Sequence, residues 1–281
     1  LNAPYLSAQE LEEIIVTAAK REQTAQEIPY NISVISGDQL DRLGISYPEA
    51  FLRAVPGLSN FDEGPHIGGA RNNYQLRGMN VNNAGNEDDN PMISQMTVST
   101  YLGEVPFFFP MKLFDLNRIE VLRGPQGTLY GRNATGGAIN IISRKPTQDV
   151  TGYIDLSYGN YNSLAIEGAV SGPLAGDKLL ARVSAKIEQR DGWGTNIAND
   201  SRIDDLKSRA LRGMLEFRPS DTVNFLLEGD YFKRDDNAYA VHFAGCVIGV
   251  CGPNAGTSRG YTVPTDPRDV SNDTQPINRP E

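Results

Sequence analysis

Three acidic residues, Glu87, Asp88 and Asp89, stand side by side in an Asn-rich stretch. Carboxylates are ligands that Ca²⁺ prefers, but this spacing differs from that of an EF-hand loop. We interpret the stretch as a solvated acidic turn, with a calcium site as the alternative. His66 and His242 are the two histidines of the chain. A lone histidine is usually exposed and unliganded, so no metal or haem cofactor is predicted at either one.

Two cysteines, Cys246 and Cys251, are separated by four residues. They lack the spacing of a zinc site. We predict a local disulfide formed in an oxidising compartment, and two free thiols are the alternative.

Motifs for catalysis are absent from the sequence. It contains no nucleophile elbow, no HExxH and no Walker A pattern, so no enzyme is predicted and any energy must come from a partner. The chain carries 26 Lys and Arg against 35 Asp and Glu, a net charge of −9, which argues against nucleic-acid binding.

A glycine-rich stretch, residues 119–146, lies between two β-branched runs at 119–122 and 139–143. Its glycines are Gly124, Gly127, Gly131, Gly136 and Gly137. Positions without a Cβ suit backbone that turns sharply where little room is left for side chains. A phosphate cradle is the alternative function for such a segment.

The order RGP (123–125), LYG (129–131) and ATGG (134–137), before an apolar strand that ends in SRKP, closely resembles the plug-domain signature of TonB-dependent outer-membrane receptors. SVISGDQLDRLGI (33–45) and AFLRAVPGLS (50–59) are also similar to that domain. The resemblance implies the following signature residues: Arg77, Gly78, Arg123, Gly124, Pro125, Tyr130, Gly131, Gly136 and Gly137.

The N-terminal arm is polar except for a short β-prone island within EEIIVTA (12–18). By residue type alone this is either the first strand of a domain or a strand that adds to the sheet edge of another protein. It resembles the TonB box of the receptor family, which implies binding to TonB in the periplasm. The implied TonB-binding residues are Glu13, Ile14, Ile15, Val16, Thr17 and Ala18.

Two long irregular stretches, residues 60–73 and 79–95, are rich in Asn, Gly and acids. Long loops in compact domains are usually functional or disordered. The family resemblance implies that they contact a small-molecule substrate, with a siderophore-type iron chelate as the default and a glycan, cobalamin or haem as alternatives. The implied substrate-binding residues are His66, Arg71, Asn82, Asn83, Asn86 and Asp88.

From Val150 onward, apolar and polar residues alternate in five runs, at 150–158, 164–171, 179–190, 211–217 and 223–231. A soluble sandwich would show the same alternation. Tight turns at 172–177 and 219–221, long connections at 191–204 and after Asp235, and a densely charged polar face favour an outer-membrane barrel in contact with lipid, with 159–162 as a short outer loop. Aromatic residues near strand ends indicate an interfacial girdle at Tyr158, Tyr161, Phe217, Tyr231 and Phe232.

The predicted fold is therefore an α+β plug followed by antiparallel strands of a barrel that has 22 strands in the family. We place an arm at 1–27, a plug domain at 28–147 and the first five barrel strands with their outer loops at 148–281, the Cys pair lying in the third outer loop. Five strands cannot close a barrel, so the rest is expected beyond Glu281 or on another chain.

The predicted location is the bacterial outer membrane. The chain begins with Leu1 and has no hydrophobic leader, so an export signal is expected to have been removed. Plug charges are expected to pair with lumen charges. The plug charges are Arg118, Glu120, Arg123 and Arg132, and the lumen charges are Glu167, Arg182, Lys186, Glu188, Arg212 and Glu216. A soluble or surface β-rich adhesion module is the alternative from another functional class.

Overall fold

The computed structural model describes residues 15–17, 23–24, 28, 31–45, 51–60, 74–79, 97–107, 112–131, 134–197, 199–220 and 222–237. The chain forms two compact units. The first contains Leu1–Phe61, Asn72–Phe108 and Leu116–Ser143, and the second contains Asp62–Arg71, Phe109–Asp115 and Arg144–Glu281. The short segment 109–115 thus interrupts the first unit and belongs to the second.

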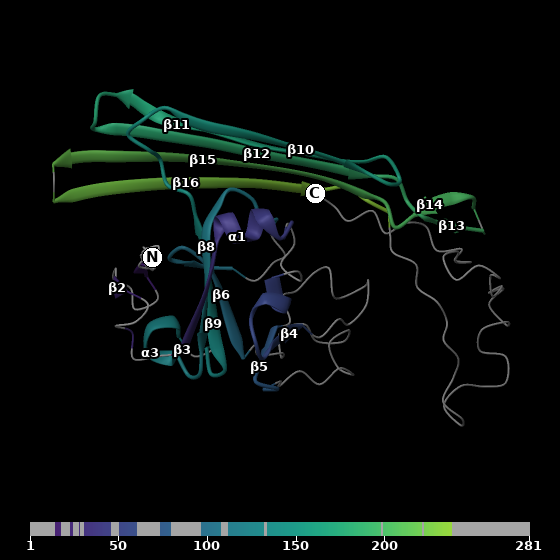
Figure 1. Cartoon of the computed structure of the whole chain (residues 1–281), viewed down its shortest axis with the longest axis horizontal. Coiled ribbons are helices and arrows are strands. Elements are labelled where there is room, and N and C mark those ends of the chain that lie inside the picture. Colours follow the sequence, from purple (N-terminus) through teal and green to yellow (C-terminus); the bar gives the residue numbers. More distant parts are fainter. Residues whose placement is uncertain are drawn as a thin grey trace, which may run out of the picture. The chain divides into compact units, whose positions relative to one another are not determined.

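A mixed five-stranded sheet in the order β3-β8-β9-β6-β7 organises the first unit (Figure 1). Neighbouring strands are antiparallel except for β6 and β9, which are parallel. Its strands are β3 Asn31–Ser36, β6 Val98–Leu102, β7 Val105–Pro106, β8 Leu116–Arg123 and β9 Gly137–Ser143. Two separate pairs join β1 Ile15–Val16 to β2 Gln23–Thr24, and β4 Leu58–Asn60 to β5 Tyr74–Leu76.

Within the described residues, three short helices accompany these strands: α1 Gly37–Arg42, the 3-10 helix η1 Leu52–Ala54 and α3 Gly127–Tyr130. The expected strand and helix at 32–43 are confirmed. Ser36 and Gln39 exchange side-chain-to-backbone hydrogen bonds of 3.2 Å, a capping box that starts α1. The sequence predicted only a glycine turn where α3 lies.

An antiparallel sheet in the order β10-β11-β12-β15-β16 forms most of the second unit (Figure 1). Its strands are β10 Thr151–Gly159, β11 Ser163–Ala175, β12 Leu179–Arg190, β15 Leu206–Ser220 and β16 Val223–Arg234. A small hairpin, β13 Gly194–Asn196 and β14 Ser201–Ile203, lies in the connection between β12 and β15. The five predicted strands are all present, and each is longer than or as long as its sequence pattern.

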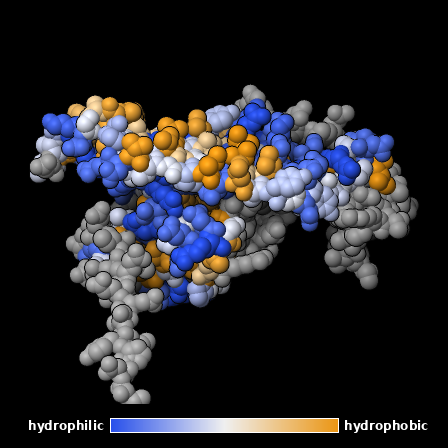
Figure 2. All heavy atoms as spheres, turned by 45° about the horizontal axis from the view of Figure 1, so that its top comes forward, coloured by the Kyte–Doolittle hydropathy of each residue, from blue (hydrophilic) through white to orange (hydrophobic). Residues whose placement is uncertain are grey.

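The exposed face of this sheet is apolar and its buried face is charged, which is the reverse of a sheet in a soluble protein. Leu227, Ile154 and Val183 are 68%, 70% and 48% exposed, whereas Arg212 and Glu216 are 1% and 2% exposed. Figure 2 shows hydrophobic residues gathered along the exposed face of these strands. An apolar outer face with charged residues inside is the arrangement of an outer-membrane barrel wall.

Two details of the sequence prediction are wrong. Phe232 pairs with the buried Ala210, so it shares the polar face and lies outside the predicted aromatic girdle. The turn predicted to begin at Gly172 begins after Ala175, because the ladder with β12 continues through a bulge between Pro173 and Ala175.

Within the residues that the structure describes, no helix is both long enough and apolar enough to cross a membrane.

Candidate functional site

The strand β1 inserts Val16 into the core of the first unit. Val16 is fully buried, in a cluster whose other buried members are Ile28, Leu122, Tyr130, Ala134 and Ala138. Burial of one valine side chain stabilises a fold by about 1.5–3 kcal/mol. The N-terminal segment is therefore held by packing as well as by its two-residue ladder with β2.

Glu120 of β8 holds the next residue of that segment. Its Oε1 accepts a hydrogen bond from the Thr17 backbone N–H at 2.9 Å and from Arg118 Nε at 2.7 Å. Arg118 also donates to Thr17 Oγ1 at 3.2 Å. Glu120 is completely buried, and Oε2 receives no hydrogen bond from any described residue. We call Thr17, Arg118 and Glu120 the Thr17 clasp.

Tyr130 lies beside the clasp in the same core. Its ring packs against that of Tyr101 at 4.9 Å, and its backbone oxygen accepts a 2.5 Å hydrogen bond from the Tyr101 hydroxyl. Burial, followed by the negative charges of Glu120 and Glu104, raises the pKa of Tyr130 far above its ordinary value. The phenol therefore stays neutral next to the buried carboxylate.

Several of the predicted signature residues allow the backbone of the first unit to turn or to pack closely. Gly78, Gly124 and Gly131 have φ of 73°, 104° and 75°, in the left-handed region that favours glycine. A Cβ on Gly137 would lie 2.3 Å from the Leu122 carbonyl oxygen and 2.5 Å from Leu76 Cδ2. Arg123 donates to the Ser33 hydroxyl. These contacts place the glycine-rich stretch in the structural framework of the sheet.

Six charged side chains of the second unit form a balanced cluster, with three of each sign. We call it the inner-face cluster; its members are Lys112, Asp115, Glu167, Arg182, Lys186 and Glu188. The Arg182 guanidinium forms a bidentate pair with the Asp115 carboxylate, and Nε lies 2.7 Å from Oδ2. Bidentate pairs of this kind are among the strongest charged hydrogen bonds.

Other contacts tie the segment before β8 to the same face. The Asp115 backbone N–H donates to Glu167 at 3.0 Å, and Lys112 forms an ion pair with Glu188. Arg212 reaches the Phe114 backbone oxygen at 3.3 Å and lies 4.7 Å from the centre of its ring. Residues 112–115 are thus fixed by charge against β11, β12 and β15.

These contacts correct the predicted charge partners. Arg118 pairs with Glu120 inside the first unit, and Arg132 lies outside the described residues. Lys112 pairs with Glu188, and Asp115 pairs with Arg182. The sequence analysis had expected Arg118, Glu120, Arg123 and Arg132 to pair with these lumen charges. The sequence offered one signal for them, a Lys and an Asp that flank Leu113-Phe114 within an otherwise apolar stretch.

Lys112 gives the cluster a pH dependence. Burial, only partly offset by the charge of Glu188, lowers its pKa from 10.5 to about 8. Between these values the unfolded chain carries a proton on Lys112 that the folded chain lacks, so stability rises as the pH increases through this window.

We expect Lys112→Met to remove this rise, which amounts to at most about 3 kcal/mol. The measurement is the free energy of unfolding between pH 7.5 and 9.5, with the exposed Lys145→Met as the matched control. Parallel profiles for wild type and Lys112→Met would contradict the assignment.

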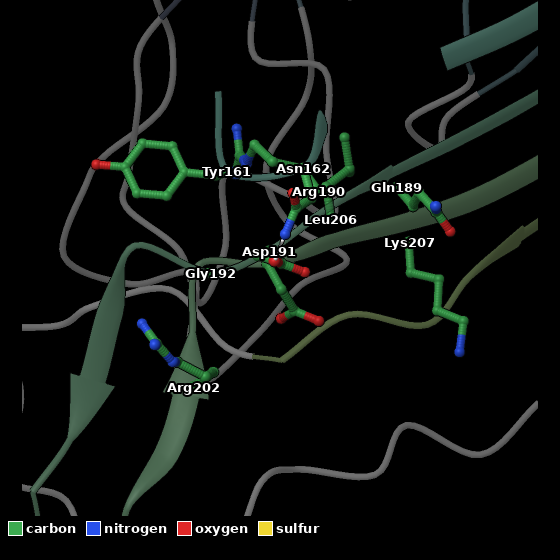
Figure 3. A pocket seen from close by; sticks show the side chains of 10 residues that line it. Tyr161, Asn162, Gln189, Arg190, Asp191, Gly192, Arg202, Leu206 and Lys207 are labelled. Carbon is green, nitrogen blue, oxygen red and sulfur yellow. Dashed lines mark hydrogen bonds between the residues drawn. The ribbon is translucent and has the colours of Figure 1, made fainter. Parts of the chain in front are cut away.

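A pocket of about 850 Å³ lies at one end of β12 and β15 (Figure 3). Tyr161, Arg190, Asp191, Arg202 and Lys207 are among its lining residues. The Arg190 guanidinium stacks on Trp193 at 3.9 Å, and the Trp193 ring lies 6.2 Å from that of Tyr161. The sequence prediction missed this pocket because its residues come from the β10–β11 turn, the end of β12 and the segment that leads through β14 into β15.

Several predicted sites lie outside the described residues. They are the TonB-box positions Glu13, Ile14 and Ala18, the substrate-binding positions His66, Arg71, Asn82, Asn83, Asn86 and Asp88, and the pair Cys246 and Cys251. Ile15, Val16 and Thr17 are described, in the positions given above.

Residues 24–138 match the family model of the TonB-dependent receptor plug domain. The chain belongs to the TonB-dependent receptors. Its two units accordingly contain the plug and the first antiparallel strands of the outer-membrane barrel wall, and the protein is located in the outer membrane. A soluble adhesion module is thereby set aside.

The similar proteins are named for different ligands. The chain is 28% identical over 224 residues to the ferripyoverdine receptor of Pseudomonas aeruginosa, covering 79% of this chain and 25% of that protein. It is 30% identical to the pesticin receptor of Yersinia pestis, covering 75% and 30%. It is 28% identical to the vitamin B12 transporter of Vibrio vulnificus, covering 86% and 38%. The chain thus spans well under half the length of these relatives.

Solved structures agree on the fold. The ferripyoverdine receptor of Pseudomonas aeruginosa matches with a TM-score of 0.64 at 22% identity, covering 80% of this chain and 28% of that chain. The ferric yersiniabactin uptake receptor of Yersinia pestis matches with a TM-score of 0.63 at 24% identity, covering 74% and 32%. The plug and barrel strands of this TonB-dependent receptor are thus shared with both.

Proposed function

We propose that this receptor takes up a ferric siderophore across the outer membrane, driven by TonB acting on residues 13–18. The Thr17 clasp carries the proposal. Together with the buried Val16, its carboxylate and its arginine hold a short strand, which is a small set of contacts for a partner to break. A strand released in this way can add its backbone hydrogen bonds to the sheet edge of a partner.

The sequence supports an external energy source, because it contains no Walker A pattern. The absence of catalytic motifs and the names of the similar proteins, which are receptors and transporters, support transport over catalysis.

Siderophore cargo is supported by the similar proteins. One is named a ferripyoverdine receptor, and a structure with the same fold is titled a ferric yersiniabactin uptake receptor. Cobalamin is the competing cargo, because another relative is named a vitamin B12 transporter.

The test separates binding from energy coupling. Cells that express the full-length protein should bind and import iron from ferripyoverdine or ferric yersiniabactin, and deletion of residues 12–18 should abolish import while leaving binding intact. Import that persists without residues 12–18 would refute energy coupling through the arm. Import of cyanocobalamin instead of iron would refute the cargo.

We expect Glu120→Leu to loosen the arm. It removes the acceptor of Thr17 and the partner of Arg118, and a hydrogen bond to a charged group contributes about 1.5–3 kcal/mol. Hydrogen exchange of the peptide that contains Thr17 should therefore become at least roughly tenfold faster. Glu104→Leu, on an exposed turn, is the control. Unchanged exchange in Glu120→Leu would show that Val16 packing alone holds the strand.

A further inference from the structure

Two buried oxygen atoms of the first unit's five-stranded sheet accept no hydrogen bond from any residue that the structure describes. One is Oε2 of Glu120, the residue that holds Thr17, and the other is Oδ1 of Asn140 on β9. Glu120 is completely buried, and Asn140 is 4% exposed. A buried acceptor without a donor is costly, so such atoms in native proteins find a partner, often an ordered water.

The register places these two side chains next to each other. Glu120 on β8 is the direct antiparallel partner of Asn140 on β9, the neighbouring strand in the sheet (Figure 1). Directly opposed residues point to the same face of a sheet, with about 4.5–5.5 Å between their Cβ atoms. The two oxygens are therefore within reach of one shared donor.

The other members of this cross-strand row supply no donor. Val34, the direct partner of Glu120 on β3, is apolar. Tyr101, the direct partner of Asn140 on β6, donates its hydroxyl hydrogen to the Tyr130 backbone oxygen at 2.5 Å. The polar pair is thus enclosed on both sides of its row.

The guanidinium of Arg118 is committed to other acceptors. Its Nε donates to Oε1 of Glu120 at 2.7 Å. Its Nη1 donates to Asn117 at 2.7 Å, and its Nη2 donates to Thr17 Oγ1 at 3.2 Å. None of these bonds reaches Glu120 Oε2, so the donor for Oε2 and for Asn140 Oδ1 comes from outside the described side chains.

The chemistry of the pair selects water over a cation. Arg118 already neutralises Glu120, so a metal cation would add an unbalanced charge to a buried site. Calcium and magnesium also take about six or more oxygen ligands, whereas this pair offers its two oxygens. A water molecule has one hydrogen to donate to each of them.

We propose that Asn140 is a positioning residue of the Thr17 clasp and acts through one buried water that it shares with Glu120. The water donates to Glu120 Oε2 and to Asn140 Oδ1, which fixes the rotation of the carboxylate. Oε1 is thereby kept on the Thr17 backbone N–H. The consequence for uptake rests on the proposed function, because a loosened clasp would offer residues 13–18 to TonB before cargo binds.

The test measures hydrogen exchange of the peptide that contains Thr17, in the full-length protein in detergent and without cargo. Asn140→Leu keeps a branched side chain but has no acceptor. It should make this exchange roughly threefold to tenfold faster, since Glu120 loses one hydrogen bond. Asn140→Ser keeps an oxygen that accepts from the water and should retain most of the protection.

Thr100→Val is the matched control. Thr100 is 2% exposed on β6 of the same sheet, and it points to the opposite face from its neighbour Tyr101. Removal of its buried hydroxyl should leave exchange at Thr17 unchanged. If Asn140→Leu does not fold, Asn140→Ala against Asn140→Ser gives the same comparison, because these two variants differ by one hydroxyl.

The proposal is overturned if Asn140→Leu exchanges like wild type or if Thr100→Val accelerates exchange equally. A high-resolution crystal structure of the full-length protein with a side chain in place of the water would also overturn it. So would a loss of protection when sodium in the buffer is replaced by choline, because that result would identify a cation.

Binding of the periplasmic domain of TonB is measured separately, so that the two proposals can fail independently. Asn140→Leu should bind this domain more tightly than wild type in the absence of cargo. Faster exchange with unchanged TonB binding would support the role of Asn140 in the clasp and count against energy coupling through the arm.

Discussion

Replacing Arg182 by methionine should lower the free energy of unfolding by about 3–5 kcal/mol, because it leaves Asp115 as a buried carboxylate without its bidentate partner. Asp115 is 3% exposed, and Arg182 supplies both of its charged hydrogen bonds. The neighbouring Tyr153 hydroxyl, at 3.3 Å from Oδ1, is too weak a donor to replace a guanidinium.

The double variant Asp115→Leu with Arg182→Met should recover most of that loss, since replacing a buried ion pair by apolar residues of similar size is often nearly neutral. Urea unfolding of the full-length protein in lipid vesicles gives the free energies, and the exposed Arg202→Met is the matched control. A double variant as unstable as the single one would show that the cluster depends on shape and not on charge pairing.

Gly137→Ala is expected to cost about 3 kcal/mol or more, because the new Cβ would clash with backbone. The Leu122 carbonyl oxygen, 2.3 Å away, belongs to the neighbouring strand β8 and cannot rotate aside as a flexible side chain would. The ladder between β8 and β9 must open to make room, which also disturbs the core around Val16.

Gly127→Ala is the matched control for this substitution. Gly127 begins α3 and needs no left-handed backbone, and a Cβ added there would meet no atom within 4 Å beyond its chain neighbours and its own helix. Alanine at this position should therefore be neutral or slightly stabilising. Limited proteolysis and thermal unfolding of the full-length protein measure both variants. Equal stability of Gly137→Ala and wild type would mean that β8 and β9 separate without cost.

The sequence predicted the strands of the second unit well, and for a physical reason. Residues such as Ile154, Val183 and Leu227 alternate with polar residues over long runs, and a period of two is available only to a strand. The sequence also indicated that the apolar residues face outward, since dense charge between them suits a wet, plugged interior. Strand ends were less certain, because the β11 ladder passes through Pro173.

The partners of charged residues could not be predicted in the same way. Arg118 and Glu120 are two residues apart and share one side of β8, so they meet each other and Thr17, about a hundred positions away. Lys112 and Asp115 stand in an apolar stretch that gives no sign of Glu188 or Arg182. Such pairings depend on which strands become neighbours.

The sequence by itself determined the receptor family, the plug framework and the membrane-facing alternation, because these depend on local residue types and on short periods. Only the tertiary structure decided that Glu120 accepts a hydrogen bond from Thr17 and that Arg182 forms a bidentate pair with Asp115. Each of these joins residues that are distant in the chain, and the packing of separate segments against one another brings them together.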